Sequence, residues 1–134
     1  MDQRGEIIVL QVDDEPALAN TVAKCLESED ERFDIDTAMS ASEGLEMLDG
    51  NDYDCIVSDY DMPGRNGIEF LEAVRDEYPD VPFILYTGKG SEEIASEAIS
   101  AGVTDYLQKK SGTAQYTVLA NRVANAVAKY RSTE

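Results

Sequence analysis

The strict alternation of short apolar runs with amphipathic stretches is the feature that most constrains the fold of this chain. The apolar runs, which we interpret as strands, are residues 7–12, 33–38, 54–59, 82–88 and 104–109. Helical spacing of apolar residues predicts helices over 16–28, from Ser40 or Ser42 onward, over 67–78, from Ser91 onward and over 115–130. In the helix that begins at Ser91, we expect the inner stripe to consist of Ile94, Ala95, Ala98 and Ile99. Such alternation predicts a parallel sheet with helices on both faces.

Right-handed crossovers leave few topologies for such a chain. We predict an α/β fold with a doubly wound, five-stranded parallel sheet in the order 2-1-3-4-5, which is the flavodoxin-like arrangement. A length of 134 residues is typical of one domain, so we expect a single domain over 1–134 with its core at 6–130. Functional sites of such sheets lie beyond the carboxyl ends of the strands.

Chemically capable residues lie at or just after the carboxyl ends of four of these predicted strands. They are Asp13 and Asp14, then Asp59, then Thr87 and Gly88, and finally Lys109 and Lys110. Uncompensated carboxylates that lie close together raise one another's pKa, and a divalent cation relieves this. Hard oxygen ligands at a water-accessible edge suit Mg²⁺. The sequence therefore predicts a magnesium site at this edge of the sheet.

A carboxylate beside Mg²⁺ can itself attack a phosphoryl group and form an aspartyl phosphate. The metal and a lysine ammonium would neutralise the phosphoryl oxygens in the transition state. Thr87 could donate a hydrogen bond to the bound group, and Gly88 would leave its N–H open to the same oxygens. The turn at Met62-Pro63-Gly64 would expose Asp59 at the top of the sheet.

Four segments carry a resemblance to a known family: QVDDEP, SDYDMPGRNGIEFL, YTGKG and AGVTDYLQKK. With them the chain resembles, from about Glu6 to Tyr130, the receiver domain of two-component response regulators. The resemblance implies a phosphoacceptor that receives its phosphoryl group from a sensor histidine kinase or a phosphotransfer protein. It also implies that the face formed by the helix that begins at Ser91, the strand 104–109 and the helix 115–130 then changes and controls a partner or an output domain.

The same resemblance implies a metal site and a phosphoacceptor. Asp59 would be the phosphoacceptor. Asp14 and Asp59 would bind Mg²⁺ through their carboxylates, and Asp13 would assist through water. The backbone carbonyl of Asp61 would be the third protein ligand.

Further roles follow for the residues around the phosphoryl group. Lys109 would pair with that group, and Thr87 and Tyr106 would form the switch pair. Lys89 and Asp61 lie where the family tunes the lifetime of the phosphoryl group. By this reading the chain is not an enzyme with a separate substrate, and it carries out only self-phosphotransfer and autodephosphorylation.

One position departs from the family pattern. The family usually has proline after the lysine, with a cis bond between them, whereas Lys110 takes that place here. A cis bond before a non-proline residue costs about 3 kcal/mol. Either the loop holds this bond, or it runs trans and shifts Lys109. We favour the cis form, because Lys109 must still point at the site.

The charge of the chain is strongly acidic, with 11 Lys and Arg against 28 Asp and Glu, a net charge of −17, and no His. Such a surface repels phosphates, so direct binding of nucleic acid is not expected. The absence of His excludes His-based metal sites and His general bases. We interpret the acidity as solubility chemistry in the cytoplasm of a halophile, and a field that selects partners is the alternative.

Residues 106–133 contain no acid but hold Lys109, Lys110, Arg122, Lys129 and Arg131. Cations near a helix C-terminus account for the last two. The alternative is that the helix 115–130 docks on an acidic partner or on a second copy of the domain. Whether the chain stands alone or comes from a longer protein is left open.

The remaining features favour a cytoplasmic protein. The N-terminus MDQRGE is polar, and no apolar run is long enough for a membrane span. Cys25 and Cys55 are interpreted as two small buried thiols.

Three other functions compete with the receiver. A phosphatase of the haloacid dehalogenase type also uses a nucleophilic Asp, but Pro63 interrupts its motif and its acid pair comes late in the chain. A flavodoxin-like cofactor binder needs a phosphate-binding loop after the first strand, where DDEP would repel phosphate. The third is a receiver that no longer accepts phosphate and serves as a scaffold.

Overall fold

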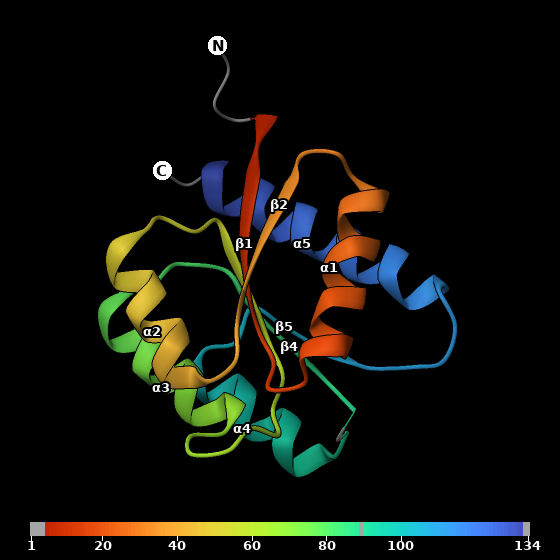
Figure 1. Ribbon diagram of the computed structural model, residues 1–134. Coiled ribbons are helices and arrows are strands. Elements are labelled where there is room, and N and C mark those ends of the chain that lie inside the picture. Colours follow the sequence, from red (N-terminus) through yellow and green to blue (C-terminus); the bar gives the residue numbers. More distant parts are fainter. Residues whose placement is uncertain (1–4, 89, 133–134) are drawn as a thin grey trace.

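The computed structural model describes residues 5–88 and 90–132, and a five-stranded sheet forms its centre (Figure 1). Its strands are β1 (Ile7–Val12), β2 (Phe33–Ala38), β3 (Cys55–Ser58), β4 (Phe83–Thr87) and β5 (Asp105–Gln108). Their order is β2-β1-β3-β4-β5, and every neighbouring pair is parallel. The predicted fold class and strand order are therefore confirmed.

Five helices cover the two faces of the sheet. They are α1 (Pro16–Glu29), α2 (Ala41–Gly50), α3 (Gly67–Glu77), α4 (Glu92–Ala101) and α5 (Ala114–Ser132). Helices α1 and α5 pack on one face, and α2, α3 and α4 on the other (Figure 1). Each face has its own core: Phe70 of α3 packs against Phe83 beneath it, and Leu26 and Leu119 lie in the opposite layer.

Several helices begin at the residues that the sequence indicates. Pro16 is in the first turn of α1, where its missing N–H costs nothing. Ser40, not Ser42, caps α2 by accepting a hydrogen bond from a backbone N–H. Asn66 and Glu69 form a capping box at the start of α3.

Two burial expectations are wrong. Ile99 was expected on the inner stripe of α4, but it is 71% exposed. The stripe that packs on the core consists of Ile94, Ala98 and Ala101, and Ile99 lies about 100° around the helix from Ala98. Cys25 is only half-buried, whereas Cys55 is buried and its burial raises the pKa of its thiol.

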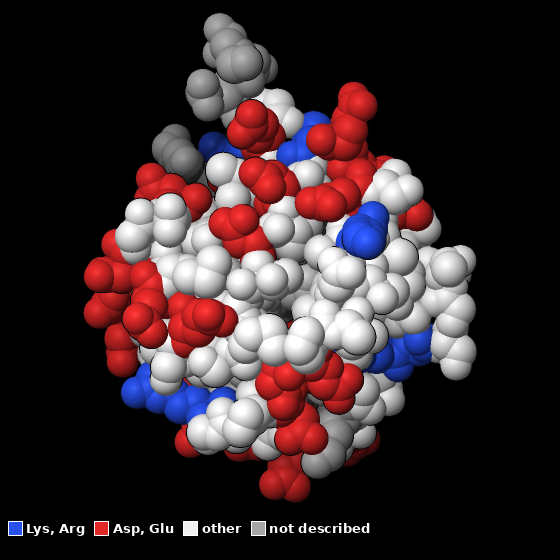
Figure 2. Space-filling view, viewed as in Figure 1, with Lys and Arg blue, Asp and Glu red and all other residues white. Residues whose placement is uncertain are grey.

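Acidic side chains gather at the top, the left and the bottom of the face shown in Figure 2, around a largely uncharged centre, and basic side chains are fewer. This distribution agrees with the net charge of −17. Within 5–88 and 90–132, no helix combines the length and the apolar character that crossing a bilayer requires.

Candidate functional site

The carboxyl ends of β1, β3, β4 and β5 meet at one edge of the sheet, and their hydrogen bonding continues into the residues that follow. The N–H of Asp13 donates to Ala38, and that of Asp59 donates to Val12, both over 3.0 Å. The N–H of Lys109 donates to the carbonyl of Thr87 over 2.8 Å. The backbone of each site residue is therefore fixed by the neighbouring strand.

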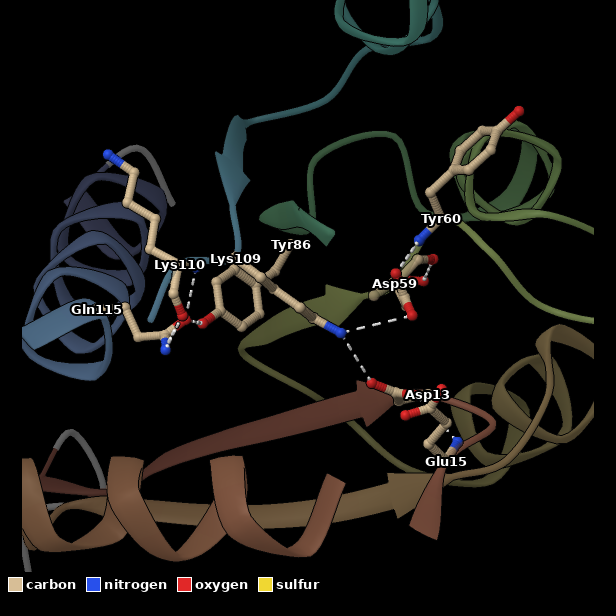
Figure 3. A network of polar contacts seen from close by, with 9 residues as sticks. Asp13, Glu15, Asp59, Tyr60, Tyr86, Lys109, Lys110 and Gln115 are labelled. Carbon is tan, nitrogen blue, oxygen red and sulfur yellow. Dashed lines mark hydrogen bonds and ion pairs between the residues drawn. The ribbon is translucent and has the colours of Figure 1, made fainter. Parts of the chain in front are cut away.

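Lys109 reaches across this edge to two carboxylates (Figure 3). Its Nζ lies 3.3 Å from Asp13 Oδ2 and 3.5 Å from Asp59 Oδ2. The side chains are 17%, 4% and 12% exposed for Lys109, Asp13 and Asp59, respectively. These contacts are therefore shielded from water more than surface ion pairs are.

The second oxygen of each of these carboxylates is held by the backbone. Asp13 Oδ1 accepts a hydrogen bond from the N–H of Glu15 over 3.0 Å. Asp59 Oδ1 accepts one from the N–H of Tyr60 over 2.7 Å. In both residues the Oδ2 atom therefore faces Lys109, and the orientation of the carboxylate is set before any ligand arrives (Figure 3).

The carboxylates of Asp13, Asp14 and Asp59 each offer an oxygen atom within 4.8 Å of the others. Together with the Lys109 ammonium they carry a net charge of −2, because three negative groups face one positive group. This donor set consists of oxygen atoms only and has an excess of negative charge, which fits Mg²⁺. Removing either carboxylate that faces Lys109 would reduce that excess charge.

An open cleft lies over these groups. It is lined by Asp14, Glu15, Leu18, Asp59, Asp61, Met62, Pro63, Thr87, Gly88 and Lys109. Asp61 is exposed at its rim, whereas Thr87 is buried. Tyr106 of β5 is half-buried and packs on the core of the α2, α3 and α4 face. Leu85 of β4 pairs with Tyr106 of β5. Thr87 comes two residues after Leu85, and alternate residues of a strand point to the same face, so Thr87 and Tyr106 lie on the same face of the sheet.

Gly67 is a site residue that the sequence reasoning missed. The N–H of this first residue of α3 donates to the carbonyl of Tyr60 over 2.8 Å. A Cβ at this position would lie 2.4 Å from the backbone oxygen of Asp59 and 2.8 Å from Tyr60 Cα. Only glycine allows α3 to begin this close to the Asp59 backbone. The sequence shows a glycine there, but the close approach is visible only in three dimensions.

The expectation of a cis bond between Lys109 and Lys110 is wrong, since the structure has no cis peptide bond in its described part. The physical reason is that Lys110, unlike proline, has an N–H, and this group donates to Gln115 Oε1 over 3.0 Å. The loop is thus held in the trans form, and Lys109 still reaches Asp13 and Asp59. Lys89, the other residue considered for phosphoryl lifetime, lies outside the described residues.

Three of the five cations in the acid-free segment 106–133 pair with acidic residues of this chain. Lys109 contacts the two site carboxylates, and Arg122 lies 2.7 Å from Asp105. Arg131 lies 3.2 Å from Asp54. Much of the positive charge predicted for a docking face is therefore already neutralised by acids from outside the segment.

Comparison with known proteins gives one consistent answer. Residues 9–121 match the model of the response regulator receiver domain. The chain is 33% identical over 109 residues to the transcriptional regulatory protein FixJ of Bradyrhizobium diazoefficiens, covering 81% of this chain and 51% of FixJ. It is 36% identical over 110 residues to the transcriptional regulatory protein ResD of Bacillus subtilis, covering 81% and 44%.

Solved structures agree with these sequence matches. A crystal structure of a response regulator receiver domain protein from Clostridium thermocellum superposes with a TM-score of 0.85 at 25% identity, covering 96% of this chain and 99% of that one. By contrast, the chain spans about half the length of the curated relatives FixJ and ResD. The likeness therefore concerns one part of those longer regulators.

Proposed function

Because the chain belongs to the response regulator receiver domain family, whose members are signalling domains, we propose that it accepts a phosphoryl group on Asp59. The observation that carries this proposal is the position of Lys109 Nζ, 3.5 Å from Asp59 Oδ2 and 3.3 Å from Asp13 Oδ2. A cation held beside a partly exposed carboxylate can stabilise the negative charge of a transferring phosphoryl group. The donor is a sensor histidine kinase or a phosphotransfer protein.

In the proposed reaction, a carboxylate oxygen of Asp59 forms a bond to phosphorus while the bond from phosphorus to the leaving group breaks. The Lys109 ammonium pairs with a phosphoryl oxygen as charge moves onto it. The Asp59 oxygen that faces Lys109 is the better placed nucleophile, because the other accepts the N–H of Tyr60 over 2.7 Å. The open cleft gives the donor access to that oxygen.

The proposal includes Mg²⁺ as the cofactor. Asp14 and Asp59 would hold it through their carboxylates, Asp13 through water, and Asp61 through its backbone carbonyl. When bound, Mg²⁺ supplies positive charge that stabilises the phosphoryl oxygens. Asp13 would then exchange part of its contact with Lys109 for the metal site.

Thr87 and Tyr106 are the proposed switch pair. Thr87 would donate a hydrogen bond to the bound phosphoryl group, and the backbone N–H of Gly88 would do the same. The space that Thr87 leaves would accept the Tyr106 ring, because both side chains lie on the same face of adjacent strands. The phosphoryl group thereby biases a two-state element that reaches the surface.

The proposed output surface is the face formed by α4, β5 and α5. Two large apolar side chains are exposed on its helices, Ile99 at 71% and Val118 at 45%. Because most of the cations nearby are paired, we propose that apolar contacts, rather than the basic side chains alone, hold the partner or the output domain. Since FixJ and ResD are transcriptional regulatory proteins, a transcription regulator is the proposed kind of output.

Intact-mass spectrometry tests the proposed function. The chain is incubated with acetyl phosphate at high salt, with Mg²⁺ or with a chelator. We expect one phosphoryl adduct per chain, which forms only with Mg²⁺. Steady turnover of a phosphate ester without an accumulating adduct would favour the phosphatase. Binding of Mg²⁺ with neither adduct nor turnover would favour the scaffold.

A further inference from the structure

The side chain of Gln115, in the first turn of α5, holds the loop between β5 and α5. Its Oε1 accepts a hydrogen bond from the N–H of Lys110 over 3.0 Å and another from the hydroxyl of Tyr86. Its Nε2 donates to the carbonyl of Gly112 over 2.8 Å and to that of Lys110. The backbone turns sharply here, since Gly112 has a φ of +87°.

All four hydrogen-bonding positions of the Gln115 carboxamide are thus filled. A primary amide has two donors and two acceptor lone pairs, and each has a partner here. The Lys110 N–H can only donate and the two carbonyls can only accept, so the amide fits in one orientation. A side chain bound in this way can fix the backbone around it more firmly than a solvated loop would be fixed.

Two of these bonds hold groups that lie next to Lys109. The first fixes the Lys110 peptide directly after Lys109, while Thr87 holds the Lys109 N–H over 2.8 Å on the other side. The second holds the hydroxyl of Tyr86, whose ring centroid lies 5.6 Å from Lys109 Nζ (Figure 3). Burial raises the pKa of Tyr86 to about 12, so its hydroxyl keeps the proton that it donates. The Lys109 side chain thus extends over an aromatic ring that Gln115 holds in place.

We propose that Gln115 is a positioning residue for Lys109, fixing both the backbone that follows it and the Tyr86 ring on which its side chain lies. Proline at position 110 could not take part in this arrangement, because it has no N–H to donate to Gln115. Gln115 therefore does here by hydrogen bonding what a rigid residue after Lys109 would do by restricting the backbone. The effect on phosphotransfer rests on the proposed function, whereas the positioning itself does not.

Gln115→Leu tests this role, because it removes all four hydrogen bonds at a similar side-chain size. Asn121→Ala, an exposed amide of the same helix, is the matched control. With acetyl phosphate and saturating Mg²⁺, adduct formation should slow by about tenfold or more in Gln115→Leu and stay unchanged in the control. In a Lys109→Ala background, Gln115→Leu should cause no further loss. If Gln115→Leu slowed adduct formation by the same factor in the Lys109→Ala background, the inference would be overturned. A wild-type rate in the single variant Gln115→Leu would also overturn it.

A second measurement does not depend on phosphotransfer. The NMR signals of the Lys109 methylene protons should be shifted by the Tyr86 ring current in the wild type and move toward random-coil values in Gln115→Leu. Unchanged signals would contradict the positioning role even if the wild type formed no adduct. If urea titration shows that Gln115→Leu is not folded, Tyr86→Phe takes its place. This variant keeps the ring and removes only the hydroxyl that Gln115 holds. It should reproduce part of the shift and part of the rate loss, and a wild-type spectrum and rate would overturn the inference.

Discussion

At the level of single residues, the site brings one ammonium group close to three carboxylates. Lys109 touches Asp13 and Asp59, and Asp14 completes the acidic group. The sequence indicated all four residues, because each lies at or just after the carboxyl end of a predicted strand. It could not indicate which oxygen of each carboxylate faces Lys109, since the backbone N–H groups of Glu15 and Tyr60 decide this.

Lys109→Ala should therefore separate metal binding from phosphotransfer. The variant loses the cation that competes for Asp13 and Asp59, so its affinity for Mg²⁺ should rise by about 1 kcal/mol, roughly fivefold. Its rate of adduct formation should nevertheless fall, because no ammonium meets the phosphoryl oxygens. Isothermal titration with Mg²⁺ measures the first effect, with Lys129→Ala, at an exposed lysine of α5, as the control. A weaker affinity in Lys109→Ala would contradict this description of the site.

Gly67→Ala should disturb the backbone of Asp59, whereas Lys109→Ala removes a partner of its side chain. Its Cβ would meet the Asp59 backbone oxygen at 2.4 Å, so α3 or the loop must move. We expect a loss of roughly 1–3 kcal/mol in the free energy of unfolding, measured by urea titration, with slower adduct formation. Gly50→Ala is the matched control, because its added Cβ meets nothing within 4 Å. Equal stability of the two variants would show that the close approach is unimportant.

At the scale of elements, the pattern of apolar residues was enough to predict the sheet. Strands β1 and β2 have the expected bounds, and the others end within one or two residues of them. The buried faces of the helices were harder to predict from the sequence, because α4 packs on the core through a narrow stripe and leaves Ile99 exposed. The trans bond after Lys109 could not be foreseen either, since it depends on the contact between Lys110 and Gln115.

The two tyrosines of the β3 and β4 region predict how stability depends on pH. Burial raises the pKa of both Tyr53 and Tyr86 to about 12, and Asp36 also contributes at Tyr53. An unfolded tyrosine titrates at about 10. The folded state therefore binds these protons more tightly, so the stabilisation is complete below about pH 10 and is lost as the pH rises toward 12. Urea midpoints between pH 9 and 12 should fall in the wild type and fall less in the double variant Tyr53→Phe, Tyr86→Phe. If the urea midpoints of the two proteins fell in parallel with pH, the raised pKa values of these tyrosines would be contradicted.

At the scale of the whole molecule, acidity dominates. A net charge of −17 destabilises the compact state through self-repulsion, and acidic groups outnumber basic ones on the face in Figure 2. Salt shortens the range of that repulsion from about 10 Å at 0.1 M to about 3 Å at 1 M. This property was readable from composition alone, whereas the pairing of Arg122 and Arg131 within the chain was not.

The urea midpoint should therefore rise as KCl is raised from 0.1 to about 1 M. Choline chloride should raise it by a similar amount, because screening depends on ionic strength and not on a bound cation. An effect of KCl alone would point to specific cation binding, and no effect of either salt would mean that self-repulsion is negligible.

The phosphoryl group is proposed to bind Asp59. The most direct test compares the wild type with Asp59→Asn and with Asp76→Asn, a control at an exposed aspartate of α3. Each protein is incubated with acetyl phosphate and Mg²⁺ and analysed by intact-mass spectrometry. We expect one phosphoryl adduct on the wild type and on Asp76→Asn, and none on Asp59→Asn. A full adduct on Asp59→Asn would mean that the phosphoryl group is bound to another residue and that Asp59 is not the phosphoacceptor.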